Sequence, residues 1–348
     1  MRAVFFSILF LFLFNNSYLD ARNPSWWRVY FSAPEECEAQ KNDPEEGLIN
    51  TIDSAKKNFY GAFYNISSLD VVAAIIRAHK KGIDVRIVTE RDYIEGEGIS
   101  RLIMAGVPVV SDTGRGFMHN KFAVIDDGII WTGSYNLTKN GTCNNNNNAI
   151  KIYSFDLANI YKAEFNEMFE NKIFSNRKEY SPFQKFLKRY HVKVEKTNIN
   201  VYFSPEDNIE RILVNRLRKA KSSIHFMAFS FTSDKIGETM IKKFKEGVFV
   251  YGLFEKRGAR SRYSEYMKMK LEGIPVKLDR NPFAMHHKVI IIDKERVITG
   301  SYNFSKRANK NNDENILIID NKEIAYYYLE EFRKLYFKKE KKRPDSPI

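Results

Sequence analysis

Motifs of several common enzyme classes are absent from this chain of 348 residues. Its two cysteines and six histidines form no cluster with the spacing of a structural zinc site, and neither an H-E-x-x-H motif nor a P-loop occurs. These absences argue against a zinc-finger module, a zincin protease and a P-loop NTPase. Beyond the first fourteen residues, no apolar run is long enough to cross a bilayer. Any catalysis must therefore come from another arrangement of polar side chains.

Acidic residues are in the minority. The chain has 56 Lys and Arg against 43 Asp and Glu, a formal net charge of +13, and its pI is near 9.4. This balance favours an anionic partner, and nucleic acid, an anionic membrane surface or a phosphorylated small molecule would all fit. Charge alone does not choose among them.

The N-terminus has the pattern of an export signal, because Arg2 precedes the apolar run Ala3–Phe14. We expect residues 1–21 to be a signal peptide or, if uncleaved, an N-terminal anchor; a buried strand is the remaining alternative. The pattern predicts an exported protein, periplasmic or secreted. Cys37 and Cys143 would suit one disulfide in such a compartment, and two unpaired small side chains are the alternative.

Short apolar strands alternate with amphipathic helices along the chain, and the alternation runs through twice. This order predicts an α/β fold with a partly parallel sheet covered by helices. We expect a first repeat at 24–174, a basic linker at 175–197, a second repeat at 198–337 and a basic tail at 338–348. The charges of the linker and the tail could bind phosphate or simply face solvent.

One motif occurs twice. Residues Met118–Asn136 read MHNKFAVIDDGIIWTGSYN, and Met285–Asn303 read MHHKVIIIDKERVITGSYN. Both contain H-x-K-x4-D-x6-G-S-x-N, at a constant offset of 286 − 119 = 167 residues. Coincidence is negligible at such a length, so the chain contains an internal duplication.

The duplicated His and Lys suit chemistry at phosphorus. Residues two apart on a strand share a face, so His119 lies beside Lys121 and His286 beside Lys288. If both pairs meet around one phosphodiester, one His can attack the phosphorus and the other can protonate the leaving oxygen. The lysines would stabilise the charge on the remaining oxygens. This chemistry needs no metal or cofactor, and the residues alone leave the two histidines exchangeable.

The rest of the motif is explained by the same geometry. Gly133 and Gly300 would permit a tight turn near the phosphate. Asp126 and Asp293 follow their lysines at an odd spacing, which turns them to the opposite face, so we expect a structural hydrogen-bonding role. Four neutral side chains near the turn are candidate phosphate donors: Ser134, Ser301, Asn136 and Asn303.

Both segments resemble the H-x-K-x4-D motif of the phospholipase D superfamily, and the chain from about Trp27 to Phe337 resembles its two-motif form. The resemblance implies two similar α/β/α sandwich repeats packed as a pseudo-dimer, with one active site at their interface. It also implies a metal-independent reaction through a covalent phosphohistidine. In several two-motif members the first His is the nucleophile, which implies that His119 attacks and His286 acts as the acid. The site residues that it implies are His119, Lys121, Asn136, His286, Lys288 and Asn303.

One difference breaks the symmetry of the two copies. The family often has an acidic residue after the motif, which here is Glu314, and its counterpart 167 residues earlier is Asn147. In related enzymes this residue contacts the His of the opposite repeat, which would place Glu314 on His119 and Asn147 on His286. A carboxylate there fixes the tautomer that leaves the other ring nitrogen free to attack. A surface Glu in a polar loop is the alternative.

We therefore expect a metal-independent phosphodiesterase that functions as a monomer, since one chain holds both motifs. An exported nuclease-like enzyme acting on nucleic acid fits the basic charge and the resemblance of YFSP, MAFSFTS and GSYNFSK to small bacterial nuclease-like members. The alternative is a phospholipase D or a cardiolipin-synthase-like phosphatidyltransferase acting on phospholipid head groups, which would suit an anionic membrane surface. No Trp-rich or amphipathic insertion for entering a bilayer is evident. A non-catalytic binding module is a third possibility that two complete motifs disfavour.

Overall fold

The computed structural model describes residues 26–34, 43–180 and 190–338. The expected signal peptide or anchor at 1–21, Cys37, residues 181–189 of the expected linker and nearly all of the expected tail lie outside the described residues. Cys143 is disulfide-bonded. Within the described ranges, no helix has the length and apolar character needed to span a membrane.

Seven strands form the first sheet, in the order β1-β8-β6-β5-β2-β3-β4. Strands β2, β3 and β4 are parallel, and the other pairings are antiparallel. The predicted partly parallel sheet is confirmed. The strands are β1 Trp27–Phe31, β2 Asn58–Phe63, β3 Asp84–Thr89, β4 Val109–Ser111, β5 Lys121–Ile125, β6 Ile129–Gly133 and β8 Asn148–Tyr153.

The second sheet repeats this order as β10-β17-β16-β15-β11-β12-β13, with β9 added at the edge beside β10. Equivalent strands thus occupy equivalent places, as a duplication requires. The strands are β9 His191–Val194, β10 Thr197–Ser204, β11 Ser223–Ala228, β12 Phe249–Phe254, β13 Val276–Leu278, β15 Lys288–Ile292, β16 Arg296–Gly300 and β17 Glu314–Asp320.

Part of the segment expected to be a basic linker is regular structure. Strand β9 forms an antiparallel hairpin with β10, and Ser175–Tyr180 is a short 3-10 helix. Val192 of β9 is buried and is paired with Ile199. The strand was missed because its alternation of apolar and polar residues lies within a run dominated by charge.

Helices cover both sheets, and most begin at a polar cap. Ser68 and Ser233 occupy equivalent positions, and each accepts a hydrogen bond from the backbone N–H three residues later. The helices are α1 Pro44–Asp53, α2 Leu69–Lys80, α3 Glu97–Met104, α4 Lys139–Cys143, α5 Phe155–Phe169, α6 Ile209–Leu217, α7 Asp234–Lys245, α8 Glu265–Leu271, α9 Lys306–Lys310 and α10 Lys322–Tyr336.

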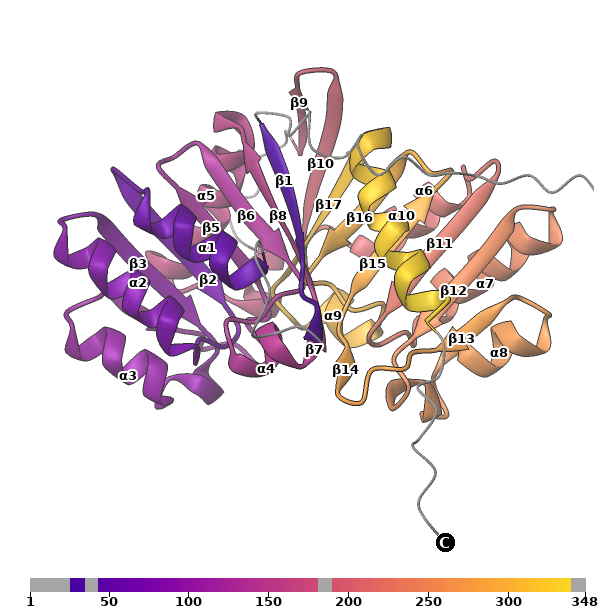
Figure 1. Ribbon diagram of the computed structural model, residues 1–348, viewed down its shortest axis with the longest axis horizontal. Coiled ribbons are helices and arrows are strands. Elements are labelled where there is room, and N and C mark those ends of the chain that lie inside the picture. Colours follow the sequence, from indigo (N-terminus) through magenta and orange to yellow (C-terminus); the bar gives the residue numbers. More distant parts are fainter. Residues whose placement is uncertain (1–25, 35–42, 181–189, 339–348) are drawn as a thin grey trace, which may run out of the picture.

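The two repeats pack through a common apolar core. In Figure 1, α1, α2 and α3 lie on the outer side of the first sheet, and α7 and α8 lie on the outer side of the second. Helices α5 and α10 pack against the inner faces, where Phe165 and Phe332 belong to one cluster that includes strands of both repeats. Burying each such ring stabilises the fold by about 1.5–3 kcal/mol, so the repeats form one unit. The predicted pseudo-dimer is confirmed.

Backbone pairing also crosses between the repeats beside each motif. The short strands β7 (Asn145–Asn146) and β14 (Ala284–Met285) are parallel partners, and an isolated bridge joins Met118 to Asp313. As a result, the backbone N–H of His286 donates a 2.9 Å hydrogen bond to the carbonyl oxygen of Asn146. The backbone N–H of His119 likewise donates a 2.9 Å hydrogen bond to the carbonyl oxygen of Asp313. Each motif histidine is therefore held by the backbone of the opposite repeat.

Candidate active site

Each motif lysine begins a central strand, and its histidine lies two residues earlier. Lys121 begins β5 and Lys288 begins β15. The Nζ atom of each lysine donates a 2.8 Å hydrogen bond to the carbonyl oxygen of the histidine in its own motif. All four residues are at least nine-tenths buried. The His-x-Lys spacing thus places each ring beside an ammonium, as predicted.

The two pairs lie close enough to act on one another. Burial, followed by the charges of Lys121 and Lys288, holds the pKa of His119 well below its usual value. The pKa of His286 is lowered by burial and by the same two lysines. Burial also lowers the pKa of Lys121 to about 7. These shifts favour the neutral form of both rings when no anion is bound, and an entering anion would stabilise the two crowded ammoniums.

The cross-pairing expected for Glu314 and Asn147 is present. Oε2 of Glu314 lies 2.7 Å from Nδ1 of His119, and Oδ1 of Asn147 lies 2.8 Å from Nδ1 of His286. The Asn147 amide is oriented by its Nδ2, which donates to the carbonyl of Gly141 at 2.9 Å. Glu314 is fully buried, and burial raises its pKa to about 7 although Lys121 acts in the opposite direction. Only one of the two histidines therefore has a carboxylate partner.

The two motif glycines permit a close approach of neighbouring strands. Gly133 and Gly300 have φ values of +155° and +151°. A Cβ atom would lie 2.3 Å from the carbonyl oxygen of Asn148 at Gly133, and 2.2 Å from that of Asn315 at Gly300. Glycine is therefore required both by its positive φ and by the closeness of the adjacent strand.

The two motif serines are not available to a phosphate, so that expectation was wrong. The Ser134 hydroxyl donates to Oδ1 of Asn147 at 2.9 Å and accepts from the N–H of Asn148 at 3.1 Å. The Ser301 hydroxyl accepts from the N–H of Asn315 at 3.0 Å, and it also hydrogen-bonds Glu314. Both serines are fully buried. They support the residues that contact the histidines.

Asn136 and Asn303 differ from the serines. Their Oδ1 atoms are buried, yet they have no hydrogen-bond partner among the described residues. An Oδ1 atom without a partner thus occurs at the same position in both repeats, two residues after each serine. A phosphate oxygen would be bound by the Nδ2 group of each amide, because Oδ1 is an acceptor, and that role stays a prediction.

The motif aspartates lie at the far ends of their strands from the histidines. Oδ1 of Asp126 accepts backbone N–H bonds from Lys56 at 2.9 Å and Lys57 at 2.7 Å. Oδ1 of Asp293 accepts equivalent bonds from Lys221 at 3.0 Å and Ser222 at 2.7 Å. Each carboxylate thus ties the end of its strand to the turn before the neighbouring strand.

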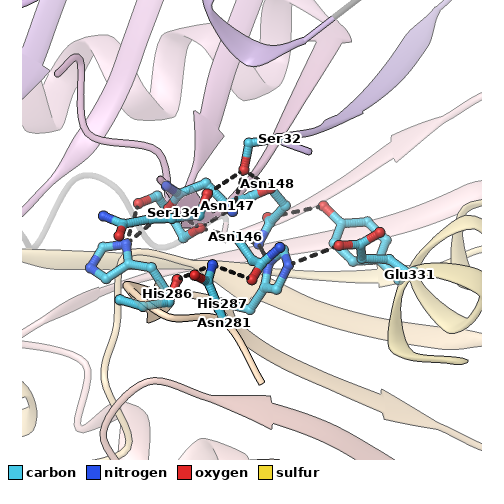
Figure 2. Close-up of polar contacts among 12 residues, drawn as sticks. Ser32, Ser134, Asn146, Asn147, Asn148, Asn281, His286, His287 and Glu331 are labelled. Atoms are coloured by element: carbon cyan, nitrogen blue, oxygen red, sulfur yellow. Dashed lines mark hydrogen bonds and ion pairs between the residues drawn. The ribbon is translucent and has the colours of Figure 1, made fainter. Parts of the chain in front are cut away.

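A buried network between the repeats was missed by the sequence reasoning. Oδ1 of Asn148 accepts from the Thr299 hydroxyl at 2.7 Å, and its Nδ2 lies 2.9 Å from Nδ1 of His287 (Figure 2). In the other half, Oδ1 of Asn315 accepts from Thr132 at 2.8 Å. The constant 167-residue offset relates Asn148 to Asn315 and Thr132 to Thr299, but it does not show that these side chains meet across the repeats. His287 points away from the site, as predicted, and Glu331 lies 3.4 Å from its Nε2.

The surroundings of the two histidines differ. His286 lies at a cavity of about 590 Å³ that is also lined by Phe229, Phe283 and Asn140. On the other side, the charge of Arg307 acts on His119, and its guanidinium lies 3.9 Å from the centre of the Phe117 ring. Arg307 and Asn140 are equivalent positions, since 307 − 140 = 167. Arg307 therefore adds a positive charge on the His119 side, whereas the equivalent residue on the His286 side, Asn140, is neutral.

The family model described as "Cardiolipin synthase, PLD-like domain" matches residues 48–169 and 213–336, together well over half of the chain. The chain belongs to the phospholipase D superfamily. A phospholipase D of Rickettsia conorii is 32% identical over 145 residues, which cover 41% of this chain and 72% of that protein. The mitochondrial cardiolipin hydrolase of Mus musculus is 33% identical over 131 residues, covering 38% of this chain and 59% of that protein.

A solved structure agrees with the duplicated fold. The phosphatidylserine synthase of Haemophilus influenzae Rd KW20 has a TM-score of 0.65 and 14% identity, and the match covers 88% of this chain and 85% of that one. At this identity the likeness concerns the fold alone. The family match and the two sequence relatives identify the chain as a phosphodiester hydrolase of the phospholipase D superfamily.

Proposed function

We propose that the chain hydrolyses phosphodiester bonds of nucleic acid through a covalent phosphohistidine on His119. The observation that carries the assignment of roles is the Glu314 carboxylate 2.7 Å from Nδ1 of His119. His286 has an amide oxygen in the equivalent place. A carboxylate stabilises the positive ring that phosphorylation creates, and an amide does so less.

In the first step, Nδ1–H of His119 donates to Glu314, and the lone pair on Nε2 attacks the phosphorus. The bond to the leaving oxygen breaks, and that oxygen takes a proton from Nε2 of His286. Nδ1 of His286 faces two acceptors, Oδ1 of Asn147 and the carbonyl of Ser134, so it keeps its own proton. His286 therefore acts as an imidazolium, a form that the bound anion favours.

In the second step, a water molecule takes the place of the leaving group. His286 accepts a proton from the water, the water oxygen bonds to phosphorus, and the bond between phosphorus and Nε2 of His119 breaks. Lys121 and Lys288 stabilise the charge on the phosphoryl oxygens in both steps. The enzyme returns to its starting state without a metal or an external cofactor.

Nucleic acid is supported by the charges and rings around the site. Exposed Arg307 forms no ion pair with any described residue, and its charge is directed to the His119 side. It could bind a neighbouring phosphate of a polyanion. Phe283 is half-exposed in the cavity beside His286, and such a ring can stack on a base regardless of its identity. The net charge of +13 fits the same class of substrate.

A phospholipid is the second candidate substrate. The names of the relatives, phospholipase D and cardiolipin hydrolase, favour it. A basic chain would also bind an anionic membrane surface. We further propose that the protein is exported, as the pattern of its N-terminus predicts. We also propose that it acts as a monomer, because both halves of the site lie in one chain. Cell fractionation and gel filtration of the active species test these two points.

A diester with a good leaving group separates the roles of the histidines. With bis-p-nitrophenyl phosphate, p-nitrophenolate leaves without protonation, so His286→Ala should release about one equivalent and then stop with a phosphorylated His119. His119→Ala should give no burst. A burst from His119→Ala alone would exchange the two roles. Cleavage should persist in excess EDTA, and its loss, with the protein still folded, would contradict the metal-free mechanism.

Substrate class requires a direct comparison. Single-stranded DNA, duplex DNA, RNA and phospholipid vesicles containing cardiolipin should be incubated with the same enzyme, with His119→Ala as the control. We expect cleavage of nucleic acid, at a rate that falls as the salt concentration rises. Arg307→Gln should slow this cleavage more than it slows cleavage of bis-p-nitrophenyl phosphate. Head-group release without nucleic-acid cleavage would favour the second candidate.

A further inference from the structure

We propose that Glu164, Glu167 and Glu206 bind a divalent cation, most suitably Ca²⁺, where the two repeats meet. This site lies outside the machinery described above, and the inference does not rest on the proposed function. Glu164 and Glu167 are three residues apart on α5 of the first repeat, so they lie on one helix face. Glu206 follows β10 in the second repeat.

The three side chains converge. One carboxylate oxygen from each lies within 4.8 Å of the other two. Glu164 and Glu167 are more than nine-tenths buried, and Glu206 is half-buried. Oε1 of Glu167 and Oε2 of Glu206 are buried atoms without a hydrogen-bond partner among the described residues. Glu167 is therefore a buried carboxylate of the cluster, and its Oε1 has no hydrogen-bond partner among the described residues.

The charges nearby do not balance. Lys178 pairs with Glu164, and its Nζ lies 3.1 Å from Oδ1 of the fully buried Asp313. Among the residues that the structure describes, one ammonium therefore faces four carboxylates, those of the three glutamates and of Asp313. The neighbouring Asp207 adds a fifth, although it accepts the N–H of Phe203 at 2.8 Å. Buried carboxylates need a counter-charge, and a bound cation would supply it.

Carboxylate oxygens are the ligands that Ca²⁺ prefers, and water can complete its shell on the half-exposed side of Glu206. A cation there would link α5 to the turn after β10, and so one repeat to the other. Asp313 connects this region to the site, because its Oδ1 accepts the N–H of Ser175 and its carbonyl accepts the N–H of His119. We expect the cation to stabilise the junction of the repeats rather than to take part in catalysis.

Thermal unfolding of the full chain tests the proposal. Protein dialysed against EDTA should be titrated with CaCl₂ or MgCl₂ at pH 7.5, with NaCl at matched ionic strength as the reference. Ca²⁺ should raise Tm in a saturable manner, as a ligand of the native state does. Glu167→Gln should fold normally, since this carboxylate has no partner to lose, and should weaken Ca²⁺ binding roughly 10-fold or more. Glu206→Gln should behave likewise.

The matched control is Glu170→Gln, at the C-cap of the same helix, where the side chain is about half exposed and pairs with Arg86. It should keep the full Ca²⁺ response. The proposal is overturned if Ca²⁺ leaves Tm unchanged, or if Glu167→Gln responds as the wild type does. It is also overturned if lowering the pH stabilises the EDTA-treated protein while Ca²⁺ does not, because protons would then neutralise the cluster.

Discussion

Replacing Glu314 by Gln should slow formation of the phosphohistidine while leaving the fold intact. Glu314 is fully buried, with Oε2 at 2.7 Å from His119 and Oε1 accepting from Nδ2 of Asn312 at 3.1 Å. Glutamine has the same shape, and with its amide oxygen towards His119 it still accepts that hydrogen bond but lacks the charge. Its NH2 then faces Nδ2 of Asn312, so the Asn312 amide must turn to present its oxygen. A hydrogen bond to a charged group contributes about 1 to 2 kcal/mol more than a neutral one. The expected result is a roughly 5- to 30-fold slower first step.

Rapid mixing with a labelled diester, followed by quenching in base, would measure that step as the rate at which phosphohistidine accumulates. Asn147→Asp is the matched change on His286, and it should alter this rate less, because His286 does not bond to phosphorus. If the Glu314 variant forms the intermediate at the wild-type rate while the Asn147 variant is slowed, His286 is the nucleophile. Unchanged urea midpoints for both variants would exclude a loss of folded protein as the cause.

Three further changes test other parts of the site. The pKa values of Glu314 and Lys121 are both about 7. As the pH rises, kcat/KM should therefore increase while Glu314 ionises and then decrease while Lys121 loses its proton. A pH–rate profile of Glu314→Gln should lack the rising limb. Asn315→Ala leaves the buried Thr132 hydroxyl without its partner and should reduce the free energy of unfolding by about 1–3 kcal/mol in urea titrations. Gly300→Ala places a Cβ 2.2 Å from the Asn315 carbonyl and should cost about 1–3 kcal/mol in the same assay.

The elements of the fold could be predicted because they are local. A helix after Ser68 follows from a cap and an apolar stripe, and a buried strand such as β3 follows from a short apolar run. Strand β9 was missed because a charged edge strand has a weaker pattern. The motif residues were found because the chain contains them twice at one offset.

The parts of the site that escaped prediction depend on contacts between distant segments. Asn148 meets Thr299 across 151 residues, and Glu164 meets Glu206 only because α5 packs beside the turn after β10. The direction of the Ser134 hydroxyl depends on β8, the neighbouring strand that provides the N–H of Asn148. Periodicity within one segment cannot reveal which atoms a separate segment places opposite it.

Duplication within one chain explains why the site can be symmetric in binding groups and asymmetric in chemistry. A homodimer would carry any substitution in both halves, so a carboxylate on one histidine would appear on the other. Here Glu314 and Asn147 differ, as do Arg307 and Asn140. Lys121 and Lys288, which we propose stabilise the phosphoryl oxygens, are the same in both halves, because charge on those oxygens needs a positive partner from either side. In the mechanism that we propose, a buried carboxylate assists the nucleophile His119 and the acid His286 does not require one, and a single chain permits that difference.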